Sequence, residues 1–124
     1  MIININFNSD EAIYLQLRNQ IIMGIATSQL CEGDALPSVR QLAESIGINM
    51  HTVNKAYAVL RQDGFIQMDR RRGAIIAIDI EKQRALNAVK ADLLVVLAEA
   101  SCRGVSKNEI HNLIDEIYDS YGGL

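Results

Sequence analysis

Two clusters of side chains in this chain could form hydrogen bonds with a polyanion. The first lies within seven residues and contains Asn49, Met50, His51, Thr52, Asn54 and Lys55. Asparagine and histidine exchange hydrogen bonds with base edges, threonine can serve a base or a phosphate, and lysine donates to guanine or to phosphate. The second cluster is the run Arg70-Arg71-Arg72-Gly73. Three like charges on one short turn repel one another, and the phosphates of a nucleic acid would relieve that repulsion. The side-chain types of the first cluster and the charge of the second both predict contact with a nucleic acid.

Local signals place the first cluster on the second of two short helices. Ser38 and Gln41 have the spacing of a capping box, which opens a helix that ends near Ile46. Asn49 is a good cap for the next helix, and the pair Asp63-Gly64 supplies its stop. The two helices are expected to be about nine and about fourteen residues long.

The turn between these helices has the spacing A-x3-G-x5-V, at Ala43, Gly47 and Val53. Ala43 lets the helices approach, Gly47 can take the left-handed conformation of a tight turn, and Val53 fills the space between the helices. The apolar residues at helical spacing toward one core are Leu42, Ile46, Ile48, Val53, Ala56, Tyr57 and Leu60. The pattern predicts a helix-turn-helix that turns its polar residues and Arg61 outward, with Arg40 placed to clamp a phosphate backbone. A polar face that is simply solvated is the alternative.

Residues 65–69 and 74–79 predict two short strands joined by residues 70–73. The result is a hairpin with three arginines at its tip. The narrow minor groove of DNA attracts inserted arginine through its negative potential. A turn that is merely soluble is the alternative, because runs of charge usually face water.

Residues 9–78 resemble the winged helix-turn-helix of the GntR family of bacterial transcription regulators. The motif residues that match at fixed spacing are Gly33, Leu36-Pro37-Ser38, Arg40, Leu42-Ala43, Gly47, Thr52-Val53, Ala56-Tyr57, Leu60 and Gly64, preceded by Ile13-Tyr14-Leu15-Gln16-Leu17. The resemblance implies DNA contacts from Arg40, Asn49, His51, Thr52, Lys55 and Gly73. The full set of candidate DNA-binding residues is Ser38, Arg40, Asn49, Met50, His51, Thr52, Asn54, Lys55, Arg70, Arg71, Arg72 and Gly73.

Two departures from the family pattern concern these contacts. Met50 and His51 stand where many relatives carry another Arg, Pro or Asn, so no operator sequence transfers from them. The stretch from Arg71 to Ile76 replaces a wing that often reads G-x-G-T followed by an aromatic residue and valine. The wing of this chain is therefore expected to be more basic.

The last third of the chain predicts two amphipathic helices. Residues 81–103 form the first, which Gly104 ends, and Ser106 with Glu109 forms a capping box for the second. An antiparallel helix pair of this size cannot bury both apolar stripes on itself, so a second copy is the expected partner. The candidate dimerisation residues are Leu86, Val89, Leu93, Val96, Leu97, Ile110, Leu113, Ile114, Ile117 and Tyr121. The alternative is that these helices pack back on the winged domain.

The expected fold is mainly α with a small β-hairpin wing. It is organised as a winged helix-turn-helix DNA-binding domain over residues 1–79 and a helical dimerisation region over residues 80–124. A two-fold dimer would set two recognition helices about one turn of DNA apart, ~34 Å, and so match a palindromic operator. The short tail is similar to that of the YtrA-type branch, which implies a two-helix dimerisation unit and, commonly, repression of ABC-transporter operons.

Charge and composition limit the remaining classes of function. The net charge is −3, yet residues 33–73 carry six positive and four negative side chains, so only this section is basic. The two histidines and the two cysteines, Cys31 and Cys102, lack the spacing of a catalytic group or zinc site, so no enzyme, metal or cofactor is expected. The longest apolar run, Leu93 to Ala98, is shorter than the ~18 residues of a membrane helix, and the first residues do not resemble a signal peptide. The cytoplasm is the expected location.

Three hypotheses of function follow from these observations. The first is a homodimeric, sequence-specific repressor of its own gene and of an ABC-transporter or envelope-stress operon. The second is a winged-helix adaptor that binds proteins and not DNA, which the acidic net charge favours and the arginine tip opposes. The third adds an unidentified small-molecule effector seated between two copies.

Overall fold

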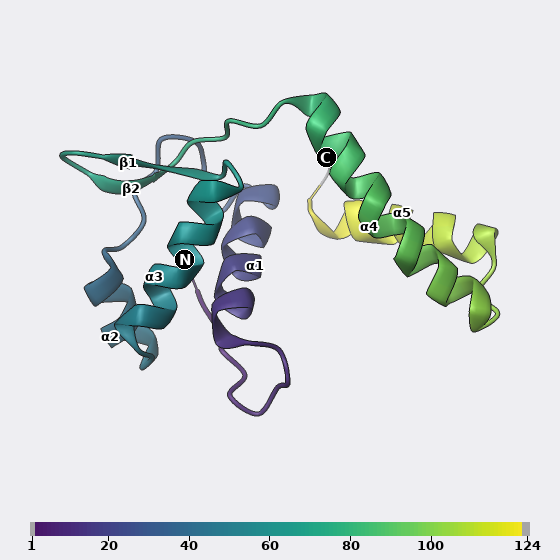
Figure 1. Cartoon of the computed structure of the whole chain (residues 1–124), viewed down its shortest axis with the longest axis horizontal. Coiled ribbons are helices and arrows are strands. Elements are labelled where there is room, and N and C mark those ends of the chain that lie inside the picture. Colours follow the sequence, from purple (N-terminus) through teal and green to yellow (C-terminus); the bar gives the residue numbers. More distant parts are fainter. Residues whose placement is uncertain (1, 123–124) are drawn as a thin grey trace. The chain divides into compact units, whose positions relative to one another are not determined.

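The computed structural model describes residues 2–122. The chain divides into two compact units, one ending at Asp79 and the other beginning at Ile80, which can be followed by colour in Figure 1. The described part contains five helices and one two-stranded antiparallel sheet, as the expected fold class requires.

The first unit consists of three helices and a hairpin. Its elements are α1 (Ile13–Ala26), α2 (Val39–Ile46), α3 (Met50–Gln62), β1 (Ile66–Asp69) and β2 (Gly73–Ile76). Residues from all five elements meet in one hydrophobic core. The fully buried large side chains of this core are Leu17, Ile21, Val53, Leu60, Ile66 and Ile76.

The predicted helix-turn-helix is confirmed by its local hydrogen bonds. The Ser38 hydroxyl accepts the Gln41 N–H at 3.1 Å, and the Gln41 side chain accepts the Ser38 N–H at 3.1 Å. Gly47 ends α2 with φ of 72°, in the left-handed region that glycine enters without steric cost. The side-chain oxygen of Asn49 accepts the His51 N–H at 2.7 Å and caps α3. The helices contain 8 and 13 residues, close to the predicted lengths.

The second strand differs from its predicted range of 74–79. It begins at Gly73, which pairs with Asp69, and it ends at Ile76. Residues 77–79 are not part of the strand, although isolated backbone hydrogen bonds connect them to the start of the hairpin. One of these runs from the Ala77 N–H to the Phe65 carbonyl at 3.1 Å. Because Gly73 belongs to the strand, the loop at the wing tip consists of the three arginines alone.

The hairpin is joined to the segment that precedes α2. Ala35 forms an isolated bridge with Ile75, and the Leu36 N–H donates to the Ala74 carbonyl at 2.8 Å. The Tyr57 hydroxyl on α3 donates to the Pro37 carbonyl at 2.7 Å, and burial raises the pKa of this phenol above its ordinary value. The wing, the start of α2 and α3 are therefore held together as one scaffold.

Two glutamines bind the amino-terminal segment to α1. The buried Gln16 accepts the Asn6 N–H at 2.8 Å and donates to the Asn6 carbonyl at 3.0 Å, and Gln20 accepts the Asn4 N–H at 2.8 Å. Two residues of extended chain span about the same length as four residues of helix. Glutamines one helical turn apart can therefore pair with alternate residues of an extended segment.

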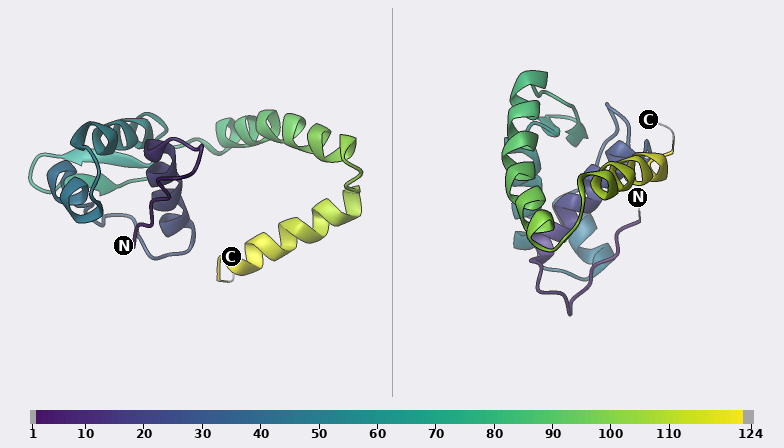
Figure 2. Two further views of the ribbon diagram at one scale, coloured as in Figure 1. Left: turned by 90° about the horizontal axis from the view of Figure 1, so that it is seen from below. Right: turned by 90° about the vertical axis from the view of Figure 1, so that its right-hand side faces the viewer.

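The second unit consists of α4 (Lys82–Cys102) and α5 (Lys107–Ser120). The predicted capping box is present, with the Ser106 hydroxyl and the Glu109 N–H 3.1 Å apart. The two helices diverge from the turn at residues 103–106 (Figure 2). The sequence predicts that such a pair cannot bury both of its apolar stripes on itself, and the divergence goes further in that direction. Neither helix has a buried residue, because a diverging pair covers little of its own apolar surface.

No helix within residues 2–122 is both long enough and apolar enough to cross a membrane.

Candidate nucleic-acid interface

The start of α3 exposes most of the predicted contacts. Met50 is 46% exposed, and His51, Asn54 and Lys55 are also exposed, whereas Thr52 is half-buried. The side-chain oxygen of Asn49 accepts the His51 N–H, which leaves the NH2 of its amide to donate to a ligand. The first turn of α3 therefore presents donors from several side chains on one helix end.

Lys55 is held in place by a residue that the sequence did not single out as a contact. Its ammonium lies over the ring of Tyr14, 4.1 Å from the ring centroid. Such a cation–π contact is worth about 0.5–1 kcal/mol at an exposed site. Tyr14 belongs to α1, so the first helix positions a side chain of the proposed recognition helix.

The start of α2 contributes Ser38 and Arg40. Both are exposed, and no ion pair of Arg40 is present in residues 2–122. The Ser38 hydroxyl accepts the Gln41 N–H, which leaves its own proton available to a phosphate oxygen. These two residues have the chemistry of a phosphate contact.

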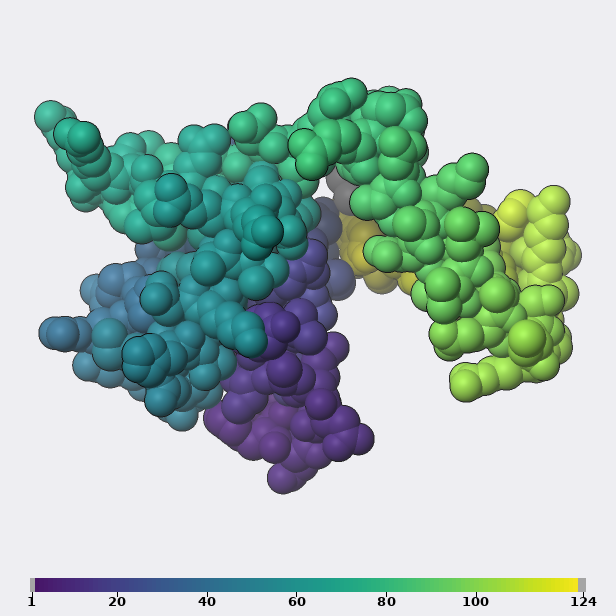
Figure 3. Space-filling view, in the orientation of Figure 1, coloured from purple at the N-terminus to yellow at the C-terminus, as the bar shows by residue number. Residues whose placement is uncertain are grey.

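The three arginines at the wing tip differ in their surroundings. The Arg72 guanidinium donates to the Gly33 carbonyl at 3.1 Å and lies 3.8 Å from the Asp69 carboxylate. Arg70 and Arg71 are exposed, and neither forms an ion pair within the described residues. Figure 3 shows the hairpin tip projecting from the body of the first unit. Arg72 therefore anchors the wing, and the other two arginines are the cations available to a ligand.

Asp69 shapes the tip. Its carboxylate accepts the N–H of Arg71 at 2.8 Å and the N–H of Arg72 at 3.1 Å. These two bonds, that of Arg71 first, hold the pKa of the Asp69 carboxyl below its ordinary value of 3.8. The ionised form of Asp69 therefore stabilises the turn.

We expect the wing tip to lose this order in acid. A lowered pKa means that the ionised carboxylate stabilises the fold above the ordinary pKa, and that this stabilisation disappears as the pH falls through the folded value. NMR titration of the Arg71 and Arg72 amides should show a transition below pH 3.8. Asp69→Asn, which keeps an acceptor oxygen but cannot titrate, should remove that transition, and its persistence in the variant would contradict the assignment.

The predicted dimerisation residues lie on the second unit. Leu86, Val89, Leu93, Val96 and Leu97 on α4 and Leu113, Ile114 and Ile117 on α5 are exposed, and Ile110 and Tyr121 are half-buried. Leu94 and Val95, which are not among the predicted residues, are also exposed, at 65% and 61%. The unbroken apolar run from Leu93 to Ala98 was the signal for them, since a run longer than one helical turn cannot stay on one face.

The chain is similar to known proteins in both sequence and structure. Residues 10–76 match the family model described as bacterial regulatory proteins, gntR family. The HTH-type transcriptional repressor YtrA of Bacillus subtilis is 33% identical over 118 residues, which cover 93% of this chain and 91% of that protein. A transcriptional antiterminator from Listeria monocytogenes EGD-e superimposes with a TM-score of 0.88 at 29% identity, covering 100% of this chain and 96% of that one. YtrA from Sulfolobus acidocaldarius, a GntR-family transcription factor, has a TM-score of 0.63 at 39% identity over 77% of this chain and 99% of its own.

The family match covers the helices and the hairpin that carry the exposed donors described above. The relatives of similar length extend the match into the second unit, and YtrA-type regulators are among them. The chain therefore belongs to the gntR family of bacterial regulatory proteins and is a DNA-binding transcription regulator of the helix-turn-helix type, not an enzyme.

Proposed function

We propose that this chain is a sequence-specific repressor that binds a palindromic operator as a homodimer. The observation that carries the proposal is the set of exposed donors at the start of α3 and at the wing tip of a gntR-family fold. Side chains of these types recognise base edges and phosphates.

In the proposed complex the start of α3 enters the major groove. Asn49, Met50, His51, Thr52 and Asn54 then face base edges, and Lys55 reaches guanine or a phosphate. Ser38 and Arg40 contact the backbone at the start of α2. Arg70 and Arg71 enter the minor groove, with Arg72 and Gly73 fixing the shape of the wing.

The second unit is the proposed dimerisation region. Its two helices expose many large apolar side chains and bury none, and apolar surface of this extent is usually covered by a partner. A second copy supplies a matching surface by symmetry. The dimer then offers two reading heads to two half-sites, ~34 Å apart or a multiple of that distance.

Repression is supported by the similar protein YtrA of Bacillus subtilis, which is a transcriptional repressor. The resemblance to the YtrA-type branch further suggests an ABC-transporter or envelope-stress operon, together with the chain's own gene, as targets. A regulator of this kind acts in the cytoplasm, where the bacterial chromosome lies.

The proposal is tested by selecting genomic DNA fragments that the full chain retains, followed by a gel shift with the selected duplex. We expect the selected fragments to share a motif with two-fold symmetry. We also expect that an unlabelled scrambled duplex of the same length does not displace the selected duplex from the complex. Reporter expression from the selected promoter should rise when the gene is deleted. A chain that shifts no duplex at low salt would support the protein-binding adaptor instead.

A further inference from the structure

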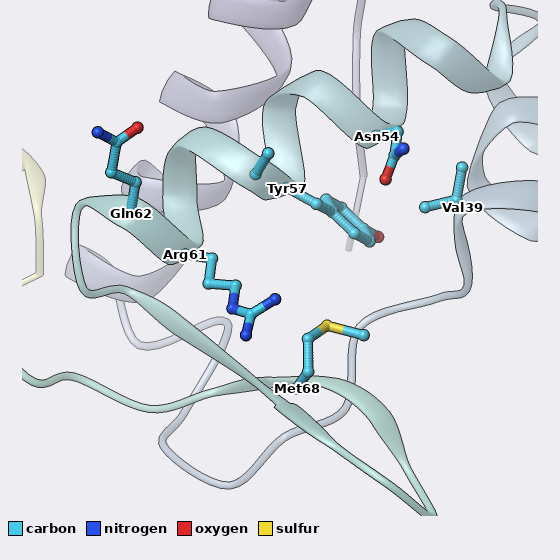
Figure 4. A pocket seen from close by; sticks show the side chains of 7 residues that line it. Val39, Asn54, Tyr57, Arg61, Gln62 and Met68 are labelled. Atoms are coloured by element: carbon cyan, nitrogen blue, oxygen red, sulfur yellow. The ribbon is translucent and has the colours of Figure 1, made fainter.

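A groove lies between α3 and the wing. Of the residues that line it, only Asn54 is among the candidate DNA contacts named above. The groove has a volume of about 500 Å³, and its walls include Val39 at the start of α2, Tyr57 and Arg61 on α3, and Met68 on β1. Figure 4 shows the Arg61 side chain extending from α3 toward Met68. Asn54, a candidate base contact, lines the end of the groove near the start of α2.

Arg61 is the charged residue of this groove. It is exposed, and it forms no ion pair with any side chain in residues 2–122. The Tyr57 hydroxyl is already used by the Pro37 carbonyl, so Arg61 and the side-chain amides of Asn54 and Gln62 are the donors that remain. The groove therefore offers a cation and two amides between apolar walls.

The position of these donors on α3 favours a linear ligand. Asn54, Ala58 and Arg61 are spaced by four and three residues, so they lie along one face of the helix. The exposed Ala58 between them has a small side chain, which leaves room above the helix. A ligand that followed this face would connect the start of α3 with the groove beside the wing.

We infer that the groove holds a sugar–phosphate strand of the operator, with Arg61 bound to a phosphate and Met68 against a deoxyribose. This inference rests on the proposed function. A DNA strand carries one negative charge per nucleotide between apolar sugar faces, which matches a groove with a single cation, Arg61, and with apolar lining from Val39 and Met68. It makes Arg61 a DNA-binding residue that sequence patterns assigned only to the solvent face.

The test measures how DNA affinity depends on salt. A fluorescein-labelled mixed-sequence duplex is used, because a phosphate contact does not depend on base sequence. Removing one phosphate contact lowers the slope of log K against log salt by about 0.9. We expect Arg61→Gln to lower the slope by about that amount per subunit and to weaken binding by up to about fivefold at low salt. Arg61→Lys should restore the slope.

The matched control is Arg84→Gln, which removes the same charge from an exposed position on α4. It should leave the slope unchanged. A second pair tests the opposite wall: Met68→Glu should weaken binding by placing an anion beside the strand, and Met68→Gln should have little effect. Thermal melting of each variant checks that the fold is intact, as expected for exposed positions.

Several outcomes would overturn the inference. If Arg61→Gln kept the parent slope while variants of Arg40 or Lys55 bound DNA more weakly, the groove would not hold the strand and the proposed function would stand. A second measurement follows the modification of Arg61 by a guanidinium-specific reagent. If the slope were unchanged and inorganic phosphate protected Arg61 from this reagent, the groove would bind a small anion and not a DNA strand. A parent protein that bound no duplex would instead refute the proposed function itself.

Discussion

The double variant Leu93→Asp with Ile114→Asp is expected to be a monomer. Both side chains are exposed on the second unit, and each aspartate would place a charge in the apolar surface that a second copy is proposed to cover. Loss of the second reading head removes the gain from linking two binding events, so affinity for a two-half-site operator should fall by about 10²- to 10⁴-fold. Sedimentation at micromolar concentration measures the assembly, and fluorescence anisotropy measures the affinity.

The matched control for this variant is Asn87→Asp with Asn112→Asp. It adds the same charges to the same two helices, at positions that are already polar and exposed. The control should remain a dimer and bind the operator as the parent does. If the Leu93/Ile114 double variant remained a dimer, the proposed interface would be wrong. Circular dichroism of both variants checks that their helices are folded as in the parent.

Replacing Arg40 and Lys55 by alanine is expected to weaken operator binding strongly while the fold persists. Removing a base contact costs about 1–3 kcal/mol, so Lys55→Ala should lower the affinity of each reading head by about fivefold to a hundredfold or somewhat more if Lys55 reads guanine. Arg40 is proposed to bind a phosphate, so Arg40→Ala should lower that affinity by up to about fivefold and also lower the salt slope. Both residues are exposed, and the intramolecular interaction at stake is the cation–π pair of Lys55 with Tyr14. The free energy of unfolding should therefore change by no more than about 1 kcal/mol.

Anisotropy titrations at several salt concentrations measure this effect, and urea unfolding measures stability. Arg84→Ala, an exposed change on α4 that removes one positive charge, should bind as the parent does. If Arg40→Ala and Lys55→Ala both bound the operator with parent affinity, the assignment of α3 and the start of α2 as the reading surface would be wrong.

Features that depend on near neighbours in the chain could be predicted from the sequence. The capping boxes at Ser38 and Ser106 join residues three positions apart, so the residue types at that spacing were sufficient to predict them. The left-handed turn at Gly47 and the cap at Asn49 are likewise local. The hairpin was predicted, but its boundaries were not, because the pairing of Asp69 with Gly73 depends on the register of two strands.

Contacts between distant parts of the chain were decided by the tertiary structure. Lys55 lies over Tyr14, and Arg72 reaches Gly33, only because the core brings α1 against α3 and the wing against the start of α2. The groove at Arg61 exists because β1 passes beside the second half of α3, and the divergence of α4 from α5 leaves their apolar faces uncovered. The sequence by itself determined the elements and their caps, since these depend on interactions within a few residues. Which side chains remain available to DNA or to a second copy was decided by packing between elements, which no local spacing encodes.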